Sequence, residues 1–103
     1  MSERPDFVVE FVSQWGTSCT GDGEFYDPRG VAVASDGSVY VSDLLNDRIQ
    51  KFTSEGVLVS KWGSEGWNDG QFGRPRGVAV ASDGSVYVAD GDNHRIQKFS
   101  VGP

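Results

Sequence analysis

The chain has little of several residue types on which common functions depend. Its 103 residues include one cysteine and one histidine. The single cysteine, Cys19, cannot form a disulfide within the chain, which fits a reducing compartment. The single histidine, His94, has no His or Cys partner to complete a metal site and no repeated nucleophile to activate as a general base. The composition therefore predicts no metal site, no catalytic residue and no cofactor.

Positive charge and long apolar runs are also scarce. Lys and Arg number 9 against 15 Asp and Glu, so the net charge at pH 7 is -6. Because nucleic-acid binding depends on clustered Lys and Arg, no nucleic-acid partner is expected, and the acidity is explained by solubility. No segment approaches the roughly 20 apolar residues of a membrane span, so no membrane partner is expected. The first residues, MSERP, lack the apolar core of a signal peptide, which favours a cytoplasmic or recombinant origin, although a secreted parent without its signal stays open.

What the chain does have is an internal repeat. Trp15-Gly16 recurs 47 positions later as Trp62-Gly63. Longer segments also recur without change, namely Gly30–Val41 as Gly77–Val88 and Arg48–Phe52 as Arg95–Phe99. A period of about 40–50 residues made of short strands is typical of β-propeller blades.

Short alternating apolar runs predict an all-β chain. The Asp36-Gly37 pair between two such runs is a hairpin signal, because glycine accepts a positive φ at little cost. No window has the sustained periodicity of a helix. The predicted strands are Phe7–Trp15, Val31–Ala34, Val39–Ser42, Ile49–Thr53, Val57–Trp62, Val78–Ala81, Val86–Ala89 and Ile96–Ser100.

The order of these strands is offset by one position relative to complete blades. The chain opens with an outer-type strand, 7–15, that has no blade of its own, and it ends with a blade that lacks its outer strand. This is the Velcro arrangement of closed propellers, in which one terminus completes the blade begun by the other. The predicted division is an N-terminal tail 1–6, two repeats over 7–100 and a C-terminal tail 101–103. The repeats consist of the outer strand 7–15, a blade unit 28–62 and the last three strands 75–100.

Several separated motifs, occurring in the same order twice, resemble the NHL repeat. In the second copy they are Gly70-x-Phe72-x-x-Pro75-x-Gly77, then Gly84-x-Val86-Tyr87-Val88-Ala89-Asp90, then Asn93–Phe99. The first copy departs from this pattern at Leu44–Asp47, which bears on the role of His94 and not on the fold. The resemblance covers about residues 7–100 and implies propellers of about six blades. It also implies a family of protein-binding and RNA-binding modules, extracellular sensor domains and a few metal-assisted lyases.

Two blades alone leave two apolar sheet faces and one strand edge in water. Exposed faces and edges drive association, and ring closure is its ordered form. Three chains give six blades, so we expect a homotrimer with three-fold symmetry and a closed six-bladed propeller. Four chains would give eight blades, and a fragment of a longer single-chain propeller is the other alternative.

A few polar and aromatic side chains could act at the loop ends of the blades. We expect Asp43 with Arg48, and Asp90 with Arg95, to be structural pairs that hold loops. The remaining candidates for a binding face, which could hold a protein or a small anion, are Arg29, Arg76, Trp67, Asn93 and His94.

For some of these residues a binding role has a competing structural explanation. Arg29 and Arg76 flank the inner strands and would form a basic ring in a trimer, unless surface carboxylates pair with them. Trp67 does not recur in the repeat, so it is an aromatic free to contact a partner. Asp90–Asn93 begins like a calcium loop but lacks its later Gly and Glu ligand positions, so turn chemistry explains it better.

The sequence predicts a non-enzymatic, self-assembling propeller scaffold or a protein- or ligand-binding module. It would be a natural array or a fragment cut from, or designed after, one. The alternatives are a degenerate relative of the metal-assisted lyases and a sensor or interaction domain of a larger protein.

Overall fold

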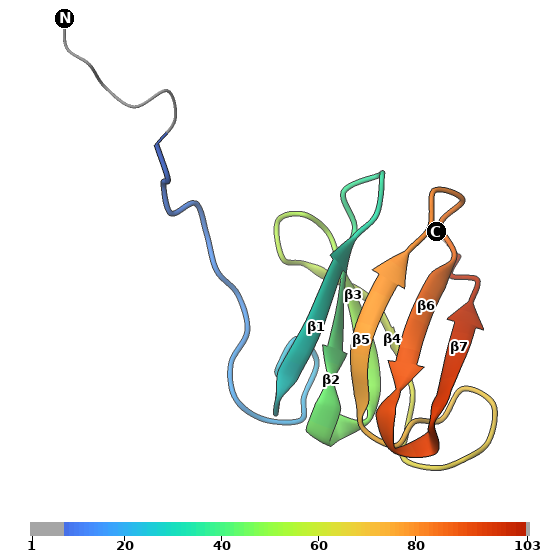
Figure 1. Cartoon of the computed structure of the whole chain (residues 1–103). Coiled ribbons are helices and arrows are strands. Elements are labelled where there is room, and N and C mark those ends of the chain that lie inside the picture. The colour runs from blue at the N-terminus through green and yellow to red at the C-terminus, as the bar shows by residue number, and fades with distance from the viewer. Residues whose placement is uncertain (1–7, 103) are drawn as a thin grey trace, which may run out of the picture.

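The computed structural model describes residues 8–102, which form two antiparallel sheets (Figure 1). The first sheet, called here the first blade, contains β1 (Pro28–Val33), β2 (Val39–Asp43), β3 (Arg48–Phe52) and β4 (Leu58–Trp62) in that order. The second blade contains β5 (Pro75–Val80), β6 (Val86–Asp90) and β7 (Arg95–Phe99). Two short 3₁₀ turns, Leu44–Asn46 and Gly91–Asn93, follow β2 and β6. The all-β prediction is confirmed, and the second blade lacks an outer strand.

The tight turn between β1 and β2 follows from its Ser-Asp-Gly-Ser sequence. The Oδ1 atom of Asp36 accepts a hydrogen bond of 2.8 Å from the backbone N–H of Ser38. Gly37 has a φ of +90°, which a residue with a Cβ rarely adopts. The turn between β5 and β6 repeats this arrangement with Asp83 and Ser85.

Each blade has two distinct faces because side chains alternate along a strand. The tyrosine face carries Tyr40 and Ile49 in the first blade, and Tyr87 and Ile96 at the repeated positions of the second. The valine face carries Val31, Val33 and Val41 in the first blade, and Val78, Val80 and Val88 in the second. The tyrosine face of the first blade packs on the valine face of the second, and the resulting core contains Tyr40, Ile49, Phe72, Val78, Val80, Val86 and Val88.

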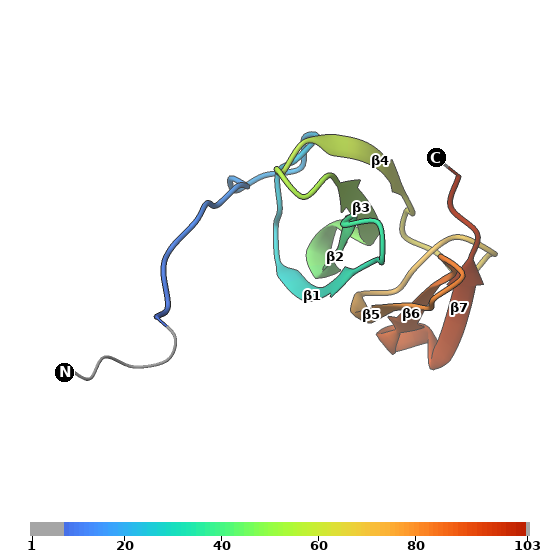
Figure 2. The same ribbon diagram turned by 90° about the horizontal axis from the view of Figure 1, so that it is seen from above.

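The inner strands β1 and β5 of the two blades lie side by side (Figure 2). A Cβ on Gly30 would lie 2.5 Å from the carbonyl oxygen of Arg76, so only glycine allows this approach. The Ser42 hydroxyl accepts from the N–H of Gly30 and donates to the same Arg76 oxygen, each over 2.8 Å. Gly30 and Ser42 therefore join the blades near the centre of the fold.

An aromatic cluster supports the outer part of each blade. Phe99 contacts Trp62 and Phe72, with ring centroids 5.3 and 5.8 Å away. In the first repeat Phe52 contacts Trp15 and Phe25, with both centroids 5.7 Å away. Trp15 is thus anchored on the first blade of its own chain.

The predicted outer strand 7–15 does not form a strand in the single chain. Residues 8–17 have no regular secondary structure, and the part of this arm before Gln14 runs away from the blades, on the side opposite β7 (Figures 1 and 2). A strand needs a neighbour for its backbone N–H and C=O groups, and the arm has none among residues 8–102. Residues 1–7 and 103, including Phe7 and the predicted tail 1–6, lie outside the described residues.

The end of the described chain lies against the blades. Val101 packs beside the core, and the carbonyl oxygen of Gly102 accepts a hydrogen bond of 3.4 Å from the Lys51 ammonium group. Within residues 8–102, no helix has the length and apolar character needed to cross a membrane.

Candidate functional site

A buried polar network holds the long loop before β1 against the end of the first blade. Asp43, at the end of β2, is fully buried, and its Oδ1 atom accepts the N–H groups of Tyr26 and Asp27 at 2.9 and 2.8 Å. The Nε atom of Arg48 lies 3.5 Å from Asp43 Oδ2, and its terminal nitrogens donate to three loop carbonyls, those of Thr20, Gly21 and Glu24. The structure thus brings Asp43 and Arg48 together with the loop that they were expected to hold.

The second blade repeats this network. Asp90 Oδ1 accepts the N–H of Gly73 at 2.7 Å, and Asp90 Oδ2 lies 2.9 Å from the Nε atom of Arg95. Arg95 also donates to the loop carbonyls of Trp67, Asn68 and Gln71. Both arginines are therefore occupied by loop backbone, which leaves them little capacity to bind a ligand.

Two further side chains per repeat belong to the network, and sequence reasoning missed their role. Asn46 bridges Asp43 Oδ2 and the carbonyl of Cys19, and Asn93 bridges Asp90 Oδ2 and the carbonyl of Gly66. Gln50 and Gln97 each accept a glycine N–H of the loop and donate to a loop carbonyl. The signal for this role in the sequence was the unchanged RIQKF segment, because its Arg and Gln side chains both hydrogen-bond to the loop. Asn93, expected on a binding face, is used within the fold.

Electrostatics in the network follow from burial and hydrogen bonding. Burial alone would raise the pKa of Asp90, but hydrogen bonds from Asn93, Gly73 and Arg95 outweigh it and lower that pKa below its usual value. Asp90 is therefore held as a charged acceptor in the loop network.

The two arginines beside the inner strands differ in their surroundings. Arg29 forms a two-pronged pair with Asp27, with nitrogen–oxygen distances of 2.9 and 3.2 Å. This hydrogen bond from Arg29 lowers the pKa of Asp27. In the second repeat the position of Asp27 is occupied by Arg74, whose Nε lies 3.6 Å from Asp92. Arg29 is thus neutralised within its own blade, whereas Arg76 is exposed and lies near Asp27, whose pKa its charge also lowers.

The other two expected contact residues lie at the surface. The Trp67 side chain is 77% exposed, and the loop network uses only its backbone carbonyl. His94 is exposed and ends the second 3₁₀ turn with a left-handed φ of 55°. The structure does not bring Trp67, His94, Arg29 and Arg76 into one hydrogen-bonded cluster.

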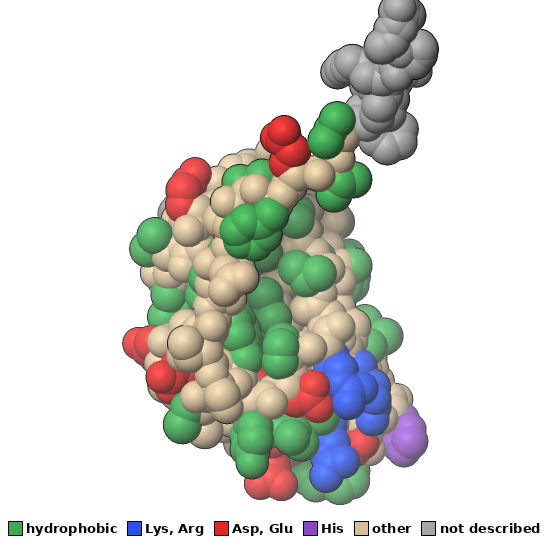
Figure 3. Space-filling view, turned by 90° about the vertical axis from the view of Figure 1, so that its left-hand side faces the viewer, with side chains coloured by type: hydrophobic (Ala, Val, Ile, Leu, Met, Phe, Trp, Pro, Cys, Tyr) green, Lys and Arg blue, Asp and Glu red, His purple; other side chains and the backbone are tan. Residues whose placement is uncertain are grey.

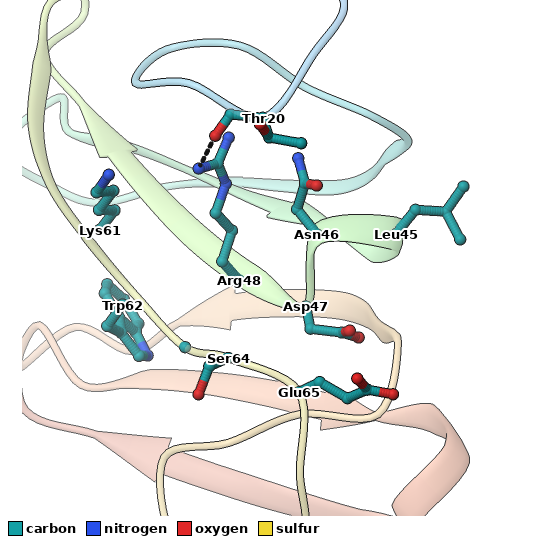
Figure 4. Close-up of a pocket in the computed structure, with 10 residues that line it drawn as sticks. Thr20, Leu45, Asn46, Asp47, Arg48, Lys61, Trp62, Ser64 and Glu65 are labelled. Carbon is teal, nitrogen blue, oxygen red and sulfur yellow. Dashed lines mark hydrogen bonds between the residues drawn. The ribbon is translucent and has the colours of Figure 1, made fainter.

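A pocket of about 470 Å³ opens between the loop ends of the two blades (Figure 4). Charged groups of both signs line it, namely Arg48, Lys61, Asp47 and Glu65. The basic groups have partners already, because Arg48 donates to Thr20 and Lys61 pairs with Asp22. In residues 8–102 no group of three or more His, Cys, Asp or Glu side chains is placed to hold a metal ion. The pocket therefore presents no free set of ligating groups.

The more distinctive surfaces are the two open blade faces. A hollow of about 310 Å³ lies on the valine face of the first blade, lined mainly by Trp15, Phe25, Val31, Val39 and Val41. A second hollow of about 290 Å³ lies on the tyrosine face of the second blade and includes Tyr87 and Ile96. Figure 3 shows hydrophobic side chains gathered over the middle of the side that carries β1, with Lys and Arg side chains together near one end and Asp and Glu side chains spread over the view.

These sheets have the fold of propeller blades, and comparison with solved structures shows the same likeness. A protein named as a phosphatase from Bacteroides thetaiotaomicron VPI-5482 matches 84% of the chain with a TM-score of 0.60 and 19% identity. A streptogramin B lyase matches 78% with a TM-score of 0.52 and 18% identity. The virginiamycin B lyase of Staphylococcus aureus matches 75% with a TM-score of 0.51 and 14% identity. The chain spans only 26–28% of these proteins, so the likeness shows the fold alone.

The sequence itself places the chain in a family. The NHL repeat matches residues 25–52 and 72–99, which together make up more than half of the chain. The chain therefore belongs to the NHL-repeat family, as its motifs indicated. None of the curated proteins matches it in sequence.

Proposed function

We propose that this chain is one third of a closed six-bladed ring and that the ring is a non-enzymatic binding scaffold. The observation that carries the proposal is a difference in exposure between two isoleucines at repeated positions. Ile49 is 0% exposed because the second blade covers it, whereas Ile96, at the same position of the second blade, is 67% exposed. Tyr40 and Tyr87 differ likewise, at 3% and 37%. A surface that the first blade buries is left open on the second.

The opposite surface of the molecule supports the same conclusion. Val31 is 65% exposed on the first blade, whereas Val78, its repeat, packs against the core between the blades. The open tyrosine face of one chain therefore fits the open valine face of another, since the contact inside the chain already has this form. Such a head-to-tail contact closes into a ring when the rotation allows it.

The N-terminal arm completes the contact. Its segment FVSQW at 11–15 matches LVSKW at 58–62, which is β4. Strand β4 pairs with β3 so that Ile49 faces Trp62 and Lys51 faces Ser60. When the same pairing is applied to the repeated positions, Trp15 of the arm faces Ile96 of a preceding chain, and Ser13 faces Lys98 of that chain. The exposed Phe11 and Val12, at 77% and 88%, then have a strand to pack with.

The number of chains follows from the number of blades. Each chain supplies two blades once the arm of its neighbour is added, and NHL propellers are expected to have about six. Three chains meet this number. The buried polar side chains at the loop ends hold loops, and each ring would present three exposed Trp67 side chains, an aromatic anchor suited to a protein partner.

A disulfide between chains tests the arrangement. Ser13→Cys and Lys98→Cys, combined with Cys19→Ser to remove the native thiol, would place two thiols on facing strand positions. Facing residues have Cα atoms about 4.5–5.5 Å apart, which a disulfide spans. We expect oxidation to give a ladder on a denaturing gel that ends at three chains, because a closed ring has no free end.

The matched control moves one thiol out of register. Val12→Cys in place of Ser13→Cys points to the other face of the strand and should cross-link poorly. A ladder that ends at four chains, or a product that stays a single chain, would overturn the proposed ring of three.

A further inference from the structure

The contact between the two blades inside the chain includes a polar pair at the loop end. Asp47 ends the first 3₁₀ turn, and its Oδ1 atom accepts a hydrogen bond of 2.7 Å from the backbone N–H of Arg74 in the second blade. Burial raises the pKa of Asp47, while this hydrogen bond and the charge of Arg74 oppose the rise. Residues 47 and 74 therefore meet across this junction, through the Asp47 carboxylate and the backbone of Arg74.

Both positions carry the opposite chemistry in the other repeat. One repeat after Asp47 stands His94, and one repeat before Arg74 stands Asp27. The backbone of His94 has φ 55° and ψ 46°, against 50° and 48° for Asp47, so the two side chains leave the turn in the same direction. His94 belongs to the open tyrosine-face side of the second blade, and Asp27 to the open valine-face side of the first.

We infer that His94 of one chain pairs with the Asp27 carboxylate of the next, because the residues at the repeated positions, Asp47 and Arg74, meet inside the chain. The inference rests on the proposed ring, in which these two residues meet at each junction between chains. Asp27 is half-buried and already accepts two hydrogen bonds from Arg29. A carboxylate offers about four acceptor positions, so an imidazole N–H can be added without displacing Arg29.

The exchange of acidic and basic residues between the two repeats favours correct contacts between blades over incorrect ones. A first blade stacked on another first blade would bring Asp47 against Asp27, two carboxylates. A second blade stacked on another second blade would bring His94 against Arg74, two basic groups. Like charges across an interface disfavour wrong partners, so the pattern selects alternating blades, the order that a closed ring requires.

A charge exchange tests the pair. The variants are His94→Asp, Asp27→Arg and the double variant, which puts the residue types of the internal junction, Asp and Arg, at the junctions between chains. The dissociation concentration of the ring would be measured for each by sedimentation equilibrium at pH 6. We expect each single variant to raise it by about tenfold or more, and the double variant to return within a few fold of the unchanged chain.

The possible results separate the pair from the ring. If the unchanged chain is a single folded chain at all concentrations, the proposed ring fails and the pair with it. If the unchanged chain forms the ring but the single variants have the same dissociation concentration as the unchanged chain, the pair is wrong and the ring stands. If the double variant is as weak as the singles, the pairing is also overturned, because the loss then has another cause. The melting temperature of the dissociated chains shows whether each variant still folds.

Discussion

Adding one methyl group at Gly77 should block assembly without disturbing the single chain. Gly77 is the repeat of Gly30, where an added Cβ would lie against the carbonyl oxygen of Arg76 across the internal junction. In the proposed ring, Gly77 lies in the same way against the carbonyl oxygen of Arg29 of the next chain. Among the described residues of the single chain, a Cβ on Gly77 meets only the Cβ of Ala89, at 3.9 Å, an ordinary contact.

The magnitude follows from the equivalent contact inside the chain. A methyl group at Gly30 would lie 2.5 Å from backbone oxygen, so the two inner strands would have to separate. Overpacking of this kind costs about 1–3 kcal/mol, and Gly77→Ala would meet it at each of three junctions. Such a cost weakens each junction by about 5- to 150-fold.

The assay compares Gly77→Ala with Gly30→Ala by light scattering and thermal melting. Gly77→Ala should give dissociated chains that keep their β structure, because the added methyl fits in the single chain. Gly30→Ala should lower the melting temperature of the single chain as well, because it separates the two blades of that chain. A Gly77→Ala protein whose ring has the mass and dissociation concentration of the unchanged chain would refute the transfer of the internal contact to the junction between chains.

Three further predictions concern the arm, the loop network and the charge. Phe11→Asp should weaken assembly, since burying a phenylalanine contributes about 1.5–3 kcal/mol. A sedimentation profile that is the same for this variant and the unchanged chain would place the arm outside the ring. Asp90→Asn should destabilise the chain by about 2 kcal/mol at pH 7 in urea unfolding. Because the pKa of Asp90 is lowered in the folded chain, its contribution to the free energy of unfolding is present above about pH 4 and is lost as the pH falls below that value. The Asn variant should therefore lose less stability on acidification than the unchanged chain. An equal loss of stability in both would contradict this. With -6 per chain, a ring of three carries -18 and should not bind single-stranded RNA in a filter-binding assay at physiological salt, so tight, salt-sensitive binding would show that Arg76 outweighs the net charge.

Local patterns of the sequence were enough to predict the elements of this fold. The Asp36-Gly37 turn and the alternating runs around it identify a hairpin, because their chemistry acts over a few residues. The repeat then shows that the second half of the chain has the same elements, and the offset of the first strand predicts an incomplete last blade. The three-stranded second sheet agrees with this prediction.

The contacts between elements were harder to predict. A repeat shows which positions are equivalent but not which ones touch, so the Ser42 bridge to Arg76 has no signal in the sequence. Arg29 was expected to contribute to a basic ring, yet Asp27, two residues away, neutralises it. Asn93 looked like a surface contact but serves the loop network, because its partners lie in a loop that is distant in sequence.

The arm illustrates a different limit. Its β-branched and aromatic residues predict a strand, but strand propensity does not say which strand it will join. Within the part of the chain that the structure describes, the arm has no strand to pair with, and residues 8–14 therefore form no strand.

The mass of the unchanged chain in solution tests the central claim most directly. Sedimentation equilibrium or light scattering at micromolar concentration would give it without any substitution. The proposed ring predicts a single species with three times the 11.1 kDa of one chain. A stable folded species with the mass of one chain, or a closed species of four chains, would contradict it.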